Sequence, residues 1–416
     1  MPKNHRALLP SVGLALATLA TPTLAQEPPS QKEMWQILQE QREQIRVLQE
    51  RLDQTTRKVE TTEKKIEATE ERVEATGAMV EKVRETRSDT PGWWQRTRVG
   101  AYGELHYNGG KKDEIDLHRF VMFLNHDFTD RIRFFSEMEI EHGVAGEGQN
   151  GEVELEQAYL QFDLSDRHRA NLGLQLIPVG ILNETHEPTT FFGVERNPIE
   201  TNILPTTWWE AGAGLNGEIQ EGIGYDVLFH SGLATPTTGA NAFKIRNGRQ
   251  KVSEAPAKDG AVTGRLRWTG LPGVEIGVTG QYQMDVTQDV SDTDATLFEA
   301  HTNLRQGPWG LRALYARWDL NGPEPEVLGR DVQQGWYIEP SYRFRMRIGE
   351  VGIFARYNEW DNNAGSSLDT KFQQIDVGLN YWPHENVVIK MDFQVQDSPA
   401  GQTEDDRVNL GLGYQF

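Results

Sequence analysis

After Trp93, the residues best suited to a functional role are charged side chains at alternate positions of the sequence. Arg343 and Arg345 lie two residues apart, and Glu137 and Glu139 repeat this spacing with the opposite charge. Side chains two apart on a β-strand point to the same face, so each pair would create a local field of one sign. Fields of this kind discriminate between ions that move along a polar surface, and they require no bond-making chemistry.

The motifs of common enzyme classes are missing from the sequence. There is no HExxH, GxSxG or P-loop motif, and there is no cysteine. Glycosidase carboxylates must face each other across a substrate, whereas Glu137 and Glu139 would share one strand face. His106 and His301 are isolated on predicted strands, where a hydrogen-bonding role is more common than metal ligation. We therefore predict no enzymatic activity, no cofactor and no metal site.

The elements that would position these charges have a period of two. In the last ten residues, RVNLGLGYQF, apolar side chains alternate with polar or small ones. A strand with lipid on one face and water on the other requires this alternation, although a soluble β-sandwich strand can show it too. Similar segments are predicted at 97–107, 115–127, 131–142, 153–163, 167–176, 209–219, 222–231, 260–269, 273–284, 296–305, 309–318, 334–345, 350–360, 372–382, 386–396 and 407–416. They predict an all-β transmembrane barrel of about 16 antiparallel strands over 97–416.

The connections and the C-terminus fit an outer-membrane barrel. Short turns such as Thr129–Asp130 occur together with long connections such as 232–259, as expected for a periplasmic and an external face. Tyr414 and Phe416 end the last strand and resemble the C-terminal insertion signal of such barrels. This resemblance implies the barrel-assembly machinery and outer-membrane lipids as partners. Tryptophans near strand ends could form an interfacial girdle or pack internally: Trp93, Trp94, Trp208, Trp209, Trp336, Trp360 and Trp382.

One long segment, 185–209, breaks the strand pattern and contains three prolines. Loops of this length usually have a function. Folding into the lumen would narrow a barrel of this size, and an external position at the rim is the alternative. Alternation and this loop together give the candidate pore-lining or constriction residues: Arg133, Arg196, Arg265, Arg267, Arg343, Arg345, Lys390 and Glu339. We expect Arg196, on the loop, to face Arg343 and Arg345.

The N-terminal part has a different organisation. Residues 1–25 are typical of a signal peptide, with a basic start, an apolar run and small residues at 23–25. After a short segment, 26–33, residues 34–86 show a heptad repeat, and 87–96 form a turn-rich linker. The coiled-coil core is predicted at Leu38, Ile45, Leu48, Leu52, Val59, Ile66, Val73, Val80 and Val83.

Charges beside this core favour a parallel homo-oligomer. Lys58 and Lys65 at g positions would meet Glu63 and Glu70 at e positions of a parallel neighbour. Because several d positions are threonine, the core residues do not show whether the coiled coil is a dimer or a trimer. An even number of strands returns both barrel ends to one side, so we expect the coil in the periplasm.

The barrel region resembles the phosphate-selective porin O and P family of Gram-negative outer membranes. The resemblance rests on EVELEQAYLQFDL and on the following segment LGLQLIPVGILNETHEPTTFFGVERNPIETNILPTTWWEAGAGLNGEI. The heptad region resembles the subgroup of trimeric porins with a periplasmic coiled coil. Membership would imply a 16-stranded barrel, a homotrimer and passive uptake of small anions. The chain departs from the phosphate-specific members in its net charge of -20.

Three functions follow as hypotheses. The first is a passive channel for small anionic solutes such as phosphate or short carboxylates, with zwitterions also possible. The second is a structural envelope protein that tethers the outer membrane through its coil, and the third is a barrel enzyme. The acidic chain excludes nucleic acid as a partner, because phosphate backbones require clustered basic charge. Conductance separates the first two hypotheses, and assays on lipid and ester substrates test the third.

Overall fold

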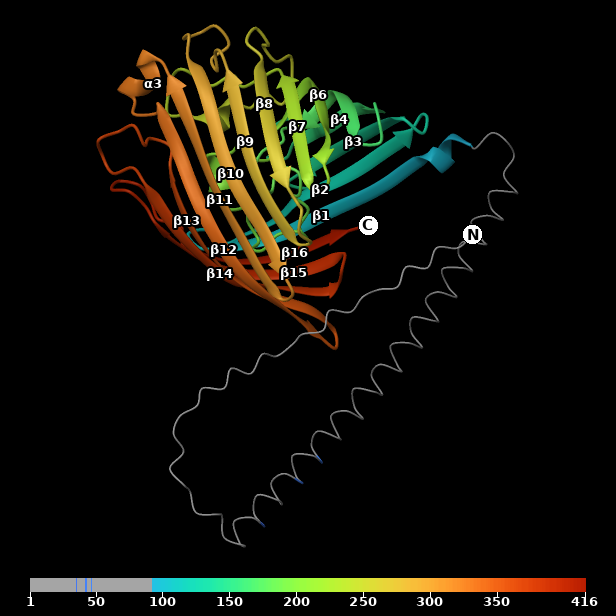
Figure 1. Ribbon diagram of the computed structural model, residues 1–416. Helices are drawn as coiled ribbons and strands as arrows, with labels where there is room; N and C mark the ends of the chain where they lie inside the picture. Colours follow the sequence, from blue (N-terminus) through green and yellow to red (C-terminus); the bar gives the residue numbers. More distant parts are fainter. Residues whose placement is uncertain (1–34, 36–41, 43–45, 47–91) are drawn as a thin grey trace, which may run out of the picture. The chain divides into compact units, whose positions relative to one another are not determined.

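The computed structural model describes Trp35, Arg42, Arg46 and residues 92–416 (Figure 1). The predicted signal peptide, the segment 26–33, the heptad core and residues 87–91 of the linker lie outside the described residues, so these assignments stay predictions. The three isolated positions are helical and exposed. Within the described part of the chain, no helix is long and apolar enough to cross a membrane.

Residues 97–415 form a closed barrel of antiparallel strands, each paired with the next along the chain, and β1 pairs with β16 to close it. The predicted barrel is therefore confirmed. The largest boundary difference is at the end of β11, predicted at 318 and found at Asn321. The strands are β1 (Thr97–Gly109), β2 (Glu114–Asp127), β3 (Ile132–Glu141), β4 (Val153–Asp163), β5 (His168–Leu176), β6 (Trp209–Gln220), β7 (Ile223–His230), β8 (Ala261–Trp268), β9 (Val274–Gln283), β10 (Asp294–Gln306), β11 (Trp309–Asn321), β12 (Val332–Met346), β13 (Gly349–Asp361), β14 (Phe372–His384), β15 (Val387–Asp397) and β16 (Arg407–Gln415).

Within residues 92–416, short helices accompany the strands. Two of them, η1 (Trp93–Arg96) and α3 (Pro323–Val327), flank strands of the barrel wall. Two others, α2 (Ile199–Asn202) and η2 (Ile245–Gly248), contact each other although they come from different connections.

The barrel wall is polar inside and apolar outside. On β14, Asp376 and Asn380 are buried, whereas Ile375 and Val377 are half exposed. Side chains of a strand alternate between faces. The exposed apolar face is therefore the outer one, and the buried polar face points into the barrel, where loops cover it. This arrangement is expected of a wall between lipid and an aqueous lumen.

Two long connections fill much of the interior. The inward loop (177–208) joins β5 to β6, and the second loop (231–260) joins β7 to β8. Buried apolar residues of both loops, including Ile203 and Phe243, form one cluster with wall residues such as Trp318 and Tyr337. The sequence predicted the second loop only as a long connection, whereas it packs against the inward loop inside the barrel.

Four of the girdle candidates are internal. Trp208, Trp209, Trp360 and Trp382 are at most 6% exposed. The indole of Trp382 donates to the Thr189 carbonyl of the inward loop, so this side chain faces the lumen. A girdle position is therefore wrong for these four, because tryptophan also packs well against the loops that occupy the lumen. Trp93, Trp94 and Trp336 are exposed.

Candidate ion-selectivity site in the barrel interior

The base of the inward loop is closed by two buried polar side chains. Asn183 donates to the carbonyls of Ile177 and Trp208 and accepts from the Trp208 amide, which joins the two ends of the loop. Glu200, on α2, accepts hydrogen bonds from the amides of Ile181 and Leu182 at 2.7 and 2.6 Å. Buried backbone groups need such partners, so these contacts stabilise a loop without regular structure.

The tip of the inward loop reaches the strands on the other side of the barrel. The Val194 amide donates to Asp392 on β15, and Asn380 on β14 donates to the Phe191 carbonyl. Arg356 on β13 donates to the Phe192 carbonyl at 3.4 Å. Because β5 and β6 lie opposite these strands in the ring, the loop crosses the lumen.

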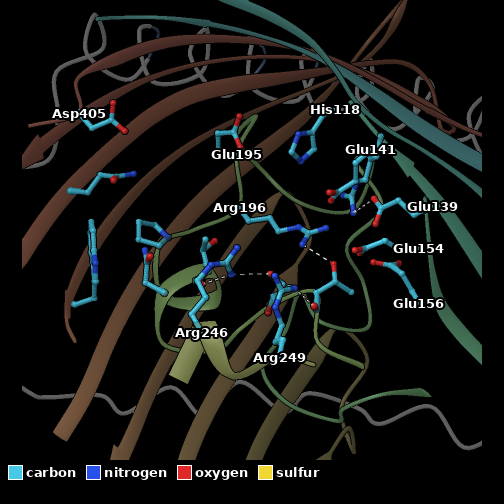
Figure 2. A pocket seen from close by; sticks show the side chains of 18 of the residues that line it. His118, Glu139, Glu141, Glu154, Glu156, Glu195, Arg196, Arg246, Arg249 and Asp405 are labelled. Carbon is cyan, nitrogen blue, oxygen red and sulfur yellow. Dashed lines mark hydrogen bonds and ion pairs between the residues drawn. The ribbon is translucent and has the colours of Figure 1, made fainter. Parts of the chain in front are cut away.

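Where the two loops meet, three guanidinium groups gather: Arg196 from the inward loop and Arg246 and Arg249 from the second loop, here called the arginine cluster (Figure 2). Arg196 donates to the Thr207 hydroxyl at 2.8 Å, and Arg249 donates to the Thr207 carbonyl. Arg246 donates to the carbonyls of Thr201 and Thr206. Within the described residues, none of the three arginines forms an ion pair with a carboxylate.

Burial and neighbouring charges affect the protonation of the arginine cluster. Burial, followed by the charges of Arg249 and Arg196, lowers the pKa of Arg246 to about 10. Burial also lowers the pKa values of Arg196 and Arg249 from their ordinary range. With a pKa of about 10, Arg246 stays protonated at neutral pH, and burial is the first cause of the lowered pKa in all three arginines.

Carboxylates face this cluster across one cavity of about 420 Å³. They come from β3 (Glu139 and Glu141) and β4 (Glu154 and Glu156) and are here called the acidic wall (Figure 2). Lys251 of the second loop binds Glu154. Opposite charges on two sides of one water-accessible space produce a field across the path of a solute.

Most of the candidate residues from the sequence are on the lumen side but already ion-paired. Their partners are Asp163 for Arg133, Glu184 and Asp226 for Arg265, Asp226 for Arg267, Glu350 for Arg343 and Arg345, and Arg356 for Glu339. Lys390 places its ammonium 3.5 Å from the centroid of the Phe191 ring. Wall charges that are ion-paired contribute little net field, whereas Lys390 has a ring contact and no hydrogen-bond partner within the described residues.

The expected meeting of Arg196 with Arg343 and Arg345 is wrong. Arg343 lies over the Trp382 ring at 4.1 Å and pairs with Glu350 at 3.4 Å, and the side chain of Arg345 is 92% exposed. Both residues line a cavity beside the short turn after β12, whereas Arg196 lines the cavity with Arg246. The expectation failed because spacing along a strand does not show which part of a loop lies opposite.

Sequence reasoning missed Arg246 and Arg249. A usable signal was present, because KIRNGRQK from Lys244 to Lys251 concentrates four basic residues within a chain of net charge -20. In an external loop such a run would be ordinary solvated surface. It gains significance only when the second loop folds into the lumen.

Comparisons with known proteins agree with the barrel fold. The family described as phosphate-selective porin O and P matches residues 101–416. An uncharacterised protein of Aquifex aeolicus (strain VF5) is 28% identical over 348 residues, which cover 76% of this chain and 79% of the relative.

Solved structures share the fold at low sequence identity. The Salmonella typhi OmpF complex with daunomycin has a TM-score of 0.55 at 12% identity, over 77% of this chain and 97% of that chain. The anion-selective porin from Comamonas acidovorans has a TM-score of 0.53 at 11% identity, over 77% and 100% of the two chains. The trimer form of OmpT from Vibrio cholerae has a TM-score of 0.51 at 11% identity, over 77% and 99%.

Proposed function

This chain belongs to the phosphate-selective porin O and P family and is an outer-membrane porin. We propose that it conducts small anions, such as phosphate or short carboxylates, and that these anions pass the arginine cluster. The observation that carries the proposal is that Arg196, Arg246 and Arg249 line one cavity with their hydrogen bonds directed to neutral oxygens. Apart from Arg249 Nε, which is buried, the remaining N–H groups of the three guanidinium forks can therefore bind a passing anion.

The chemistry of the guanidinium fits this role. Its planar fork matches two oxygens of a carboxylate or phosphate and stays charged at any working pH. At a separation of ~4 Å, one unit charge changes the energy of an ion by about 1 kcal/mol even in bulk water. Since ~1.4 kcal/mol corresponds to a tenfold ratio, each arginine supports roughly a five-fold preference for anions. The acidic wall opposes this preference, and its pairing with Lys251 and Arg119 weakens that opposition.

The reversal potential in a salt gradient across a planar bilayer tests the proposal directly. We expect the purified protein to prefer anions. Substitution of all three cluster arginines by glutamine should lower the anion-to-cation permeability ratio by at least about five-fold at low salt. Arg345→Gln is the matched control, because this exposed guanidinium lies outside the arginine cluster. An unchanged ratio in the triple variant would refute the assignment, and a protein without conductance would favour the structural-tether hypothesis.

The assembly that we propose is a homotrimer whose coiled coil, 34–86, extends into the periplasm, as in the porin subgroup with an N-terminal coil. The even number of strands supports this orientation, because β1 begins and β16 ends on the same side of the barrel. One structure with the same fold is the trimer form of OmpT from Vibrio cholerae, which supports the same stoichiometry here. In this arrangement outer-membrane lipids and the barrel-assembly machinery are the remaining partners.

A further inference from the structure

Glu156 of the acidic wall also belongs to a second group of ionisable residues, together with Glu137 and His186. His186 of the inward loop places Nε2 3.5 Å from Glu137 Oε1 on β3 and 3.5 Å from Glu156 Oε2 on β4. The three side chains are at most 3% exposed, and one ligand atom from each lies within 4.8 Å of the others. The loop and two wall strands therefore converge on one small polar site.

The backbone of β4 is irregular where it contributes to this site. Glu137 pairs with Gln157 while Met138 pairs with Leu155, so Glu156 is the extra residue of a β-bulge. A bulge re-aims the side chain of its extra residue. As a result Glu156 turns into the lumen beside Glu137 and becomes completely buried.

The hydrogen bonds around the site leave specific atoms unpartnered. His186 Nδ1 lies 3.1 Å from the Asn183 carbonyl, which only accepts, so Nδ1 carries a proton and Nε2 is left as a lone pair in the neutral ring. Within the described residues, Nε2 of His186 and both carboxylate oxygens of Glu156 have no hydrogen-bond partner. Glu137 accepts from the Tyr102 hydroxyl and from Gln157, which holds this carboxylate in place.

We infer that His186, Glu137 and Glu156 bind a divalent transition-metal ion of the Zn²⁺ class, which fastens the inward loop to the wall. Tetrahedral ligands at ~2.1 Å from zinc are ~3.4 Å apart, close to the two separations of 3.5 Å. The backbone hydrogen bond at Nδ1 is the usual support of a metal-ligating imidazole.

Charge balance favours a cation at this position. Arg119 pairs with Glu104 at 2.5 Å and approaches Glu139 at 3.9 Å, so both of its ion pairs are with carboxylates outside the site. A divalent ion with two carboxylates and a neutral imidazole is neutral overall, whereas a protonated His186 would leave a net charge of about -1 on the three buried side chains. Glu156 also lines the cavity that contains the arginine cluster, so the site lies next to the lumen.

Metal analysis of the full-length protein in detergent tests the inference. After treatment with EDTA and gel filtration, the protein should take up a single equivalent of Zn²⁺ per chain, and Co²⁺ in its place should give visible d–d absorption. Zn²⁺ should also raise Tm, because a ligand that binds the folded state stabilises it. Glu156→Gln keeps the size of the side chain and should abolish the uptake, the Co²⁺ absorption and the shift of Tm.

A second potential metal group supplies the control. Asp116, His118 and His142 also lie close together, and His142 is exposed. His142→Ala should retain the bound Zn²⁺. The assignment would be overturned if the wild-type protein took up no Zn²⁺. It would also be overturned if His142→Ala lost Zn²⁺ binding while Glu156→Gln kept it. His186→Gln should behave like Glu156→Gln. If the His186 variant does not fold, the result for the Glu156 variant decides the question.

Discussion

The backbone amide of Val194 donates a hydrogen bond of 2.6 Å to Oδ2 of Asp392, a residue 198 positions later in the chain. This contact joins the tip of the inward loop to β15, and Asn409 donates to the other oxygen of the same carboxylate. Hydrogen bonds to a charged group contribute about 1.5–3 kcal/mol. Asp392 is therefore one of the wall residues that hold the loop tip in the lumen, together with Asn380 and Arg356.

Asp392→Ala should release the loop tip. We expect a larger open-channel conductance with more current noise in single-channel recordings, and a lower Tm, because the Val194 amide loses its partner. Asp397→Ala is the control, since this exposed carboxylate ends the same strand. Identical conductance and noise in Asp392→Ala would mean that other contacts hold the loop tip.

Reversal of charge at Arg343 and Arg345 should have a smaller effect than the sequence alone suggests. Arg343 is paired with Glu350 and Arg345 is exposed to solvent. At low salt, we expect Arg343→Glu with Arg345→Glu to shift the reversal potential less than Arg246→Glu with Arg249→Glu, which changes the same number of charges. Both shifts should shrink at 1 M salt, where the Debye length is ~3 Å. A larger shift from the Arg343 and Arg345 pair would place the selective region beside β12.

Loss of the terminal aromatic side chain should impair membrane insertion without breaking the barrel closure. The Phe416 amide and carbonyl both bond to Ala101 at 2.9 Å, and its side chain is 76% exposed. Phe416→Ser preserves the backbone contacts, so a severe fall in outer-membrane levels would be due to the side chain. Phe393→Ser makes the same change at another outward position, and we expect it to have a modest effect. Normal abundance of the Phe416 variant in membrane fractions would argue against an insertion signal.

Deletion of residues 34–86 should leave a trimer that resists detergent. We expect large barrels to associate through their walls, whereas a coil with threonine at several d positions is only moderately stable. The oligomeric state of the truncated protein can be measured by gel electrophoresis without heating and by native mass spectrometry. Monomers would identify the coil as the element that holds the trimer together.

The sequence by itself determined the strands and the closed wall. The strand predicted at 153–163 is β4 with the same bounds, and the segment predicted at 372–382 is a strand whose alternation separates an outer from an inner face. This success has a local cause, because lipid on one side and water on the other impose a period of two on every strand. Each segment carries that information in its own residues.

Only the tertiary structure decided which charges meet. Arg196 lies with Arg246 and Arg249 because two loops separated in sequence pack together inside the barrel. Likewise, one extra residue in β4 turns Glu156 toward His186. Such contacts depend on the path of irregular loops and on strand register, which residue spacing does not encode. The wall could therefore be predicted from local pattern, while the site required non-local packing.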